Sequence, residues 1–203
     1  MTKGEAKKQA LRWLDEATLN GQPAGIELTA DYTDKFDYFL WNVLVYISAI
    51  FKLERSFICE KGLGVKLGGF YKFELPKDFI ELQRINVYDE NGLSQIYDYI
   101  KEGKKTFLIP KRYMEDEKYT VEILYFGMPE EIASDAEDST ELDVQPIAVQ
   151  LVPLRLAIEA TAGSDETNAI SAYLEGKFSN MVANLLGDQD GAFNVVVERV
   201  YAQ

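Results

Sequence analysis

Residues 33–52, TDKFDYFLWNVLVYISAIFK, decide the fold class of this chain. Apolar side chains recur along them at helical spacing and form one continuous stripe. The stripe consists of Phe36, Phe39, Leu40, Val43, Leu44, Ile47, Ile50 and Phe51. Asp31 or Thr33 can accept hydrogen bonds from the free amides of the first turn. The stretch therefore predicts a long amphipathic helix that ends at about Lys52.

This helix overlaps the most apolar run of the chain, Tyr38–Leu53. The run contains the polar residues Asn42 and Ser48, and it is shorter than the roughly 20 residues that a bilayer core requires. We therefore expect a helix buried in a protein core, and no membrane partner. Residues Met1–Gln9 lead into an amphipathic pattern rather than an apolar secretory core, so we expect the chain to be made and kept inside a cell.

Another helix is predicted upstream, from about Thr2 to Leu19, where apolar residues again recur at helical spacing. Asn20–Gly21 is a suitable stop for it, because both residues tolerate the left-handed conformation that ends many helices. Residues 22–32 contain proline and glycine and are predicted to form a loop. Two N-terminal helices are therefore expected before the pattern changes.

After Lys52 the apolar period changes from 3.6 to about 2, which predicts an antiparallel β insertion beginning near Ser56. The predicted strands are 56–60, 70–75, 82–88, 94–100, 106–110 and 118–126. The glycines between residues 62 and 69 mark turns. They lack the spacing of a phosphate-binding loop, and no helix follows them. We expect a small sandwich or barrel.

Helical spacing returns after an acidic connector at 129–142. Helix three is predicted over 144–163, with a kink at Pro153, because proline removes an internal hydrogen bond. Helix four is predicted from a cap at Ser164 to a stop at Gly187. Helices three and four are expected to form an antiparallel hairpin.

These elements predict an α+β fold in three parts. Two N-terminal helices and the C-terminal helical hairpin form a four-helix bundle, made of residues 1–55 and 142–187. An antiparallel β lobe at 56–141 is inserted between helices two and three. Residues 188–203, here called the C-terminal arm, are expected to be extended, since the end of this segment is apolar and rich in β-branched residues.

The C-terminal arm carries the candidate functional residues. Its apolar side chains have no remaining sequence to pair with, so we expect them to dock on a partner rather than fray. The predicted partner-docking residues are Phe193, Val195, Val196, Val197, Val200 and Tyr201. A frayed end is the alternative.

Composition excludes several function classes. The formal charge is −13, from 34 acidic and 21 basic residues, which argues against a surface that grips phosphate. The chain has no histidine, so serine-histidine, cysteine-histidine and histidine-metal sites are absent. Its one cysteine, Cys59, lies in an apolar context and suggests a buried thiol. We expect no catalytic residue, no metal and no cofactor.

Two other functions remain open at this point. Asp135, Glu137 and Asp138 could act as oxygen ligands of a divalent metal in an enzyme, because magnesium sites do not require histidine. The β region could instead bind a peptide or a sugar through its tyrosines. These are Tyr71, Tyr88, Tyr97, Tyr99, Tyr113, Tyr119 and Tyr125. No interleaved basic groove accompanies them, which favours sheet packing and protein contact over base stacking.

The order of elements and two motifs carry a resemblance to a known family. Residues 75–88, LPKDFIELQRINVY, are followed by 119–129, YTVEILYFGMP, and then by an alanine-rich helix segment at 157–162. This pattern, which spans roughly Asp34 to Leu186, resembles the head-tail adaptor proteins of tailed bacteriophages, also called head completion or neck connector proteins.

The resemblance implies a structural virion protein with no enzymatic activity. Such a subunit assembles below the portal protein as a ring, expected to be a dodecamer that matches the portal. It extends the DNA channel and provides the attachment site for the stopper or tail protein. The implied location is the neck of the virion, after assembly in the host cytoplasm. An acidic channel lining would let DNA pass without specific binding, since contacts that neutralise phosphate would retard it.

Overall fold

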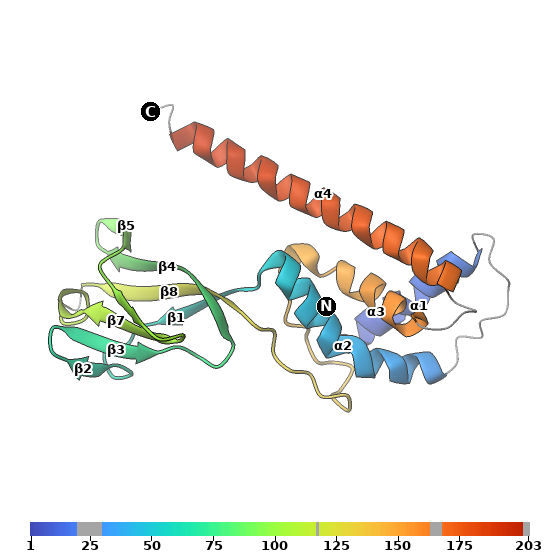
Figure 1. The fold of residues 1–203 in the computed structure, drawn as a ribbon, viewed down its shortest axis with the longest axis horizontal. Helices are drawn as coiled ribbons and strands as arrows, with labels where there is room; N and C mark the ends of the chain where they lie inside the picture. Colours follow the sequence, from blue (N-terminus) through green and yellow to red (C-terminus); the bar gives the residue numbers. More distant parts are fainter. Residues whose placement is uncertain (20–29, 117, 163–167, 201–203) are drawn as a thin grey trace. The chain divides into compact units, whose positions relative to one another are not determined.

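A computed structural model of the chain describes residues 1–19, 30–116, 118–162 and 168–200, with the side chains of 18, 19, 30, 31, 33 and 188–200 left undescribed (Figure 1). The chain divides into two compact units. The helical unit comprises Met1–Phe51 and Glu131–Gln203, and the β unit comprises Lys52–Glu130. Each unit has its own hydrophobic core.

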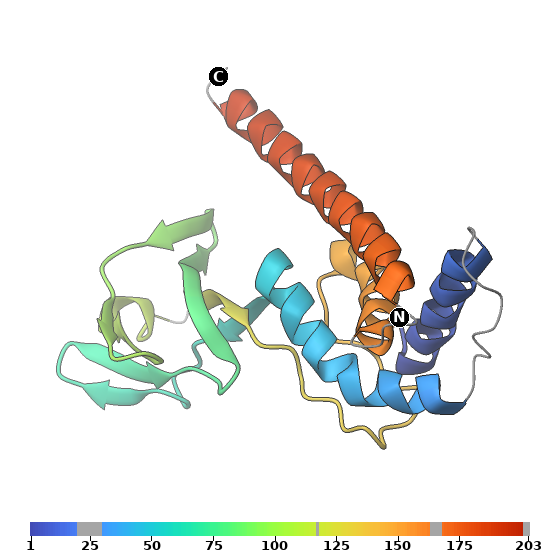
Figure 2. The same ribbon diagram turned by 45° about the vertical axis from the view of Figure 1, so that its right-hand side comes forward.

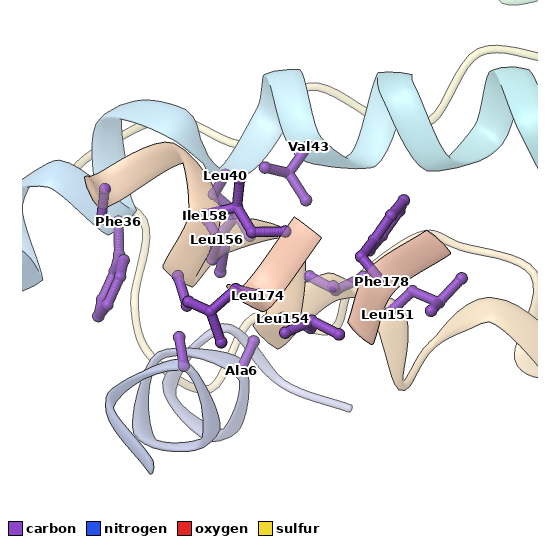
Figure 3. Packing of buried hydrophobic residues seen from close by; sticks show 14 of the residues in the cluster. Ala6, Phe36, Leu40, Val43, Leu151, Leu154, Leu156, Ile158, Leu174 and Phe178 are labelled. Atoms are coloured by element: carbon purple, nitrogen blue, oxygen red, sulfur yellow. The ribbon is translucent and has the colours of Figure 1, made fainter. Parts of the chain in front are cut away.

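The helical unit is organised around α3 (Leu151–Thr161), which α1 (Lys3–Leu19), α2 (Ala30–Phe51) and α4 (Asn168–Val200) all contact. Nine of the eleven residues of α3 are buried, so this helix is enclosed on nearly every side. A helix that is apolar all round is stable only when it is surrounded in this way. Figure 3 shows its side chains packed among those of the three neighbouring helices.

The core of the helical unit contains residues from all four helices. The labelled members in Figure 3 are Ala6, Phe36, Leu40, Val43, Leu151, Leu154, Leu156, Ile158, Leu174 and Phe178. The stripe predicted on residues 33–52 supplies the contribution of α2, and its members Phe36, Leu40 and Leu44 are at most 1% exposed. The prediction of this helix is therefore confirmed.

Helix three begins later than predicted. Pro146–Ala148 forms a separate 3-10 turn, and α3 starts at Leu151. Pro153 consequently lies in the first turn of α3, where the missing amide hydrogen has no intrahelical acceptor to lose. The predicted stop signals at Asn20–Gly21 and Gly163, and the cap at Ser164, lie outside the described residues.

The β unit is built from eight strands in the described residues. They are β1 (Glu54–Ile58), β2 (Val65–Leu67), β3 (Phe70–Glu74), β4 (Phe79–Asp89), β5 (Gly92–Ile96), β6 (Ile100–Glu102), β7 (Thr106–Pro110) and β8 (Thr120–Gly127), with a 3-10 turn at Lys111–Tyr113. They form two four-stranded antiparallel sheets. The first sheet has the order β1-β8-β4-β5, and the second has the order β2-β3-β7-β6. A core of fourteen buried residues belongs to this unit alone.

The two ends of the β unit lie side by side. β1 and β8 pair along their length, with Glu54 opposite Phe126. Beyond this pair, the Gly127 amide donates a hydrogen bond to the Leu53 carbonyl at 2.9 Å. The chain thus enters and leaves the β unit at one place.

The predicted fold class is wrong. Within the described residues the chain is an α+β protein with four helices and two antiparallel four-stranded sheets, not a four-helix bundle that carries a small inserted lobe. In a bundle each helix buries one face, whereas α3 is buried all round. Strand β2 was not predicted, and the predicted strand 94–100 is divided into β5 and β6.

The expected extended conformation of the C-terminal arm is also wrong. The backbone of α4 remains helical through Gly187 to Val200 (Figures 1 and 2). Extending an existing helix requires no new nucleation, and each valine lowers helix stability by only about 0.5 kcal/mol. The predicted stop at Gly187 therefore does not end the helix. No helix among the described residues is long and apolar enough to cross a membrane.

Candidate functional site

The first half of α4 is anchored in the helical core. Ile170, Leu174 and Phe178 are buried, and they recur every four residues on one face of the helix. Leu185 is the last described side chain that packs against this core, and Leu186 is 37% exposed. α4 then continues to Val200, so its C-terminal part extends beyond the last described contact with its own unit (Figure 2).

The predicted docking residues lie on this continuation. The helical backbone of α4 includes five of them, Phe193, Val195, Val196, Val197 and Val200, but the structure does not describe their side chains. The sixth, Tyr201, lies outside the described residues. Positions 193, 196, 197 and 200 follow the i, i+3, i+4, i+7 spacing typical of an amphipathic helix. Val195 does not belong to that series, so the helical backbone changes which of the predicted residues share a face.

Arg155 fixes the base of α4. Its guanidinium donates hydrogen bonds at 2.9 Å to Oε1 of Glu159 on its own helix and of Glu175 on α4. It also lies 4.4 Å from the ring centre of Tyr46 and 5.7 Å from that of Phe178. A planar cation held between two carboxylates and two rings gives strong directional contacts in a partly buried place. Helices α2, α3 and α4 are therefore joined by one side chain.

Lys177 makes a second anchor between α4 and α1. Its ammonium forms an ion pair with Glu16 and lies 4.9 Å from the Trp13 ring and 5.1 Å from the Tyr173 ring. The hydrogen bond to Glu16 is the main cause that raises the pKa of Lys177 above its ordinary value. Both anchors lie at or before residue 178, which leaves the later part of α4 outside them.

A buried lysine holds the acidic connector against the helices. Lys3 is only 2% exposed, and its ammonium lies 3.0 Å from Oδ1 of Asp37. It also donates hydrogen bonds to the carbonyl oxygens of Ser134 at 2.8 Å and Ala136 at 2.7 Å. A buried charge is tolerated only with such partners. Lys3 therefore ties α1 and α2 to the segment that returns from the β unit.

The carboxylates proposed as metal ligands do not form a metal site. Asp138 pairs with Lys7 at 3.1 Å, and Lys7 also contacts Asp37 at 3.1 Å. Among the residues that the structure describes, no group of three His, Cys, Asp or Glu side chains is arranged to hold a metal ion, and this includes Asp135 and Glu137. Burial lowers the pKa of Lys7, but its hydrogen bonds and charge interactions with the two aspartates outweigh this effect and raise it.

The negative charge of the chain is concentrated in one unit. Thirteen basic and fourteen acidic residues fall within Lys52–Glu130, so the β unit has a formal charge of −1. The remaining eight basic and twenty acidic residues give the helical unit −12. Nearly all of the repulsion toward phosphate therefore comes from the helical unit.

The tyrosines of the β unit do not gather in one binding site. Tyr71 and Tyr125 are buried in the core, whereas Tyr97 is exposed. Tyr113 and Tyr119 line a hollow of about 410 Å³ together with Cys59 and other residues. Two of the seven tyrosines thus share a hollow, and the seven do not form one ligand site. Burial raises the pKa of the Cys59 thiol to about 12, so the thiol stays protonated and unreactive.

The motif at residues 75–88 has a structural role. The Tyr125 hydroxyl donates a hydrogen bond to Oδ2 of Asp78 at 3.2 Å, and Arg55 Nε lies 3.5 Å from the same oxygen. A Cβ atom at Gly127 would approach Arg55 Cγ to 2.7 Å, so this close packing requires glycine. Burial, followed by the charge of Asp78, raises the pKa of Tyr125 to about 12. These side chains line an open hollow of about 450 Å³ together with Lys77.

Sequence reasoning did not find Lys3 or Arg155. Lys3 occupies the apolar stripe of its helix, at positions 3, 6, 10, 14 and 17, which is a signal for burial.

Comparison with known proteins found no family model that matches this chain and no match among curated proteins.

Proposed function

We propose that this chain is a head-tail adaptor of a tailed bacteriophage. It is a structural subunit without enzymatic activity that forms a ring, taken to be twelve-fold, below the portal protein. The ring extends the DNA channel and offers the attachment site for the stopper or tail protein. Its place is the neck of the virion, after assembly in the host cytoplasm.

The continuation of α4 beyond Leu185, its last described contact with the helical core, carries this proposal. The anchors at Arg155 and Lys177 hold the base of the helix, and its described contacts with the core end at Leu185. The C-terminal arm then continues with an apolar series at helical spacing. An amphipathic helix that projects from its unit is suited to a hydrophobic groove on a partner, and here we assign that groove to the portal protein.

The charge distribution also supports the proposal. A helical unit with a formal charge of −12 that faces a channel would repel DNA and leave it free to slide. Binding of DNA requires basic groups that displace counterions. The resemblance of residues 75–88 and 119–129 to adaptor proteins points to the same class of protein.

The test is binding of the purified chain to the portal protein encoded near its gene. We expect co-elution in size-exclusion chromatography and rings on the portal in electron microscopy. The variant with Val196→Asp and Val200→Asp should lose binding by at least about 100-fold, because buried unpaired carboxylates cost several kcal/mol. Val195→Asp is the control, since it places one such carboxylate off the helical series, and it should bind like the natural chain.

Two results would count against the proposal. If the natural chain neither binds the portal protein nor forms rings, the chain is not an adaptor. If Val195→Asp weakens binding as much as the double variant, the arm does not dock as an amphipathic helix. Circular dichroism of each variant checks that the fold is retained.

A further inference from the structure

The second sheet of the β unit has an apolar outer face. Its inner face carries Tyr71, Phe73, Phe107 and Ile109, which belong to the core. On the opposite face, cross-strand partners form three rows, of which one is polar, with Glu74, Thr106 and Glu102, and two are mainly apolar. One mainly apolar row is Leu67, Phe70 and Pro110, and the other is Val65, Lys72, Leu108 and Ile100. Leu108 is buried although it belongs to neither core, so its neighbours on this outer face cover it.

Aliphatic side chains on this face are open to solvent. Val65 is 66% exposed, Leu67 is 51% exposed and Ile100 is 48% exposed. Val65 and Leu67 lie on β2, and Ile100 lies on β6, which are the two edge strands of the sheet. The apolar face therefore reaches both edges. Exposed aliphatic groups gathered on one sheet face mark a surface for contact with protein.

The outer face of the first sheet differs. Asn86 lies opposite Gln95 on one side and Glu122 on the other, and the Tyr88 hydroxyl donates a hydrogen bond to Glu122 at 2.5 Å. The edge strands of this sheet also carry exposed aliphatic groups on this face, Ile58 at 47% and Leu93 at 56%, so the difference lies in the polar groups between them. The second sheet thus differs from the first in carrying Phe70, Leu108 and Pro110 on the outer face of its middle strands.

The segments that form the second sheet are basic. The segments 61–77 and 98–113 supply β2, β3, β6 and β7, and they contain nine basic and three acidic residues, a formal charge of +6. The rest of the β unit holds four basic and eleven acidic residues, a charge of −7. The second sheet is therefore the basic part of an otherwise acidic chain.

We infer that this basic, apolar sheet face is the site where the acidic helical unit of a second copy docks. The inference rests on the proposed function, because ring assembly supplies the second copy. Charge complementarity favours this occupant, because the sheet segments have a formal charge of +6 and the helical unit has a formal charge of −12. Such a contact between unlike surfaces is heterologous, and heterologous contacts are those that close into rings.

A nucleic acid fits this face less well. Its exposed groups Val65, Leu67 and Ile100 are aliphatic and lie on the edge strands, whereas single strands require exposed aromatic rings for stacking. Several cations are also already paired within the unit. Lys66 lies 3.0 Å from Glu115, Lys72 lies 2.8 Å from Glu102, and Arg112 pairs with Asp98.

The test compares Leu67→Glu with Leu93→Glu in the full-length chain. Leu93 is 56% exposed on β5, an edge strand of the other sheet, so both variants place a carboxylate at a half-exposed leucine. Sedimentation velocity measures self-association of the chain alone and together with the portal protein. Leu67→Glu should weaken the contact between copies by at least about tenfold, and Leu93→Glu should leave it unchanged.

A second variant, with Lys61→Glu and Lys104→Glu, tests the charge. Self-association of the natural chain should weaken as salt rises from about 0.05 to about 0.5 M, and this variant should associate more weakly and respond less to salt. If the natural chain assembles and Leu67→Glu assembles equally well, the inference is overturned and the adaptor proposal stands. If the natural chain neither assembles nor binds the portal protein, both fail. DNA binding that the lysine variant abolishes, with self-association unchanged, would assign the face to nucleic acid.

Discussion

Replacing Lys3 with methionine tests whether the buried lysine holds the helical unit together. Methionine keeps most of the side-chain length but removes the ammonium. Asp37 retains Lys7 at 3.1 Å, so its charge is not left alone. The carbonyl oxygens of Ser134 and Ala136, which Lys3 meets at 2.8 and 2.7 Å, lose their donor.

The expected loss follows from these contacts. Loss of each part-buried hydrogen bond from the charged donor costs about 1.5–3 kcal/mol, and breaking a buried ion pair costs about 3–5 kcal/mol. Removal of the buried charge itself offsets part of this cost. We expect the free energy of unfolding of the helical unit to fall by about 3 kcal/mol, a large part of the 5–15 kcal/mol typical of a domain. With a urea slope of about 2 kcal/mol per M, the midpoint should fall by about 1.5 M.

Tryptophan fluorescence can follow this unit alone. Both tryptophans of the chain, Trp13 and Trp41, lie in the helical unit. Lys8→Met is the control, because Lys8 is an exposed lysine of the same helix, and it should change stability by less than about 0.5 kcal/mol. A urea midpoint for Lys3→Met equal to that of the control would refute the reasoning.

Four further results are expected. Cys59 should react with a thiol reagent at pH 8 about a thousandfold more slowly in the folded chain than in urea, because its pKa of about 12 lies three units above the ordinary value; equal rates would contradict this. The same raised pKa should lower stability only as pH rises above about 9, where the unfolded thiol ionises. Gly127→Ala should destabilise the β unit by about 1–3 kcal/mol in hydrogen exchange, because its Cβ would meet Arg55, whereas Gly62→Ala meets nothing within 4 Å and should not. Arg155→Lys should lower the urea midpoint in tryptophan fluorescence, because an ammonium cannot make the same fork to two carboxylates; a midpoint equal to the natural chain would argue against that role.

Hydrophobic period predicted most elements because their burial is one-sided. The helix predicted on residues 33–52 buries one stripe, and strand β8, predicted at 118–126, buries every second residue. Strand β2 was missed because all three of its residues are exposed, so burial gives it no alternation. The C-terminal arm was misjudged because β-branched residues were weighed without the helix that precedes them.

The candidate site was less predictable than the fold. The formal charges of −12 and −1 on the two units appear only with the correct boundaries, because the predicted lobe at 56–141 holds eleven basic and eighteen acidic residues, a charge of −7, and leaves −6 for the rest. The apolar rows on the second sheet are different. They depend on which strands are neighbours, and β2, which supplies Val65 and Leu67, was not among the predicted strands. Pairing between distant segments cannot be deduced from the period of any one of them.

The adjacent entry and exit of the β unit have an evolutionary consequence. Leu53 and Gly127 are hydrogen-bonded neighbours, so the whole of the intervening chain is attached to the rest through a single narrow junction. An exchange of that segment for another with equally close ends would leave the packing around α3 untouched. Recombination can therefore diversify one unit while the sequence of the other stays under its own constraints.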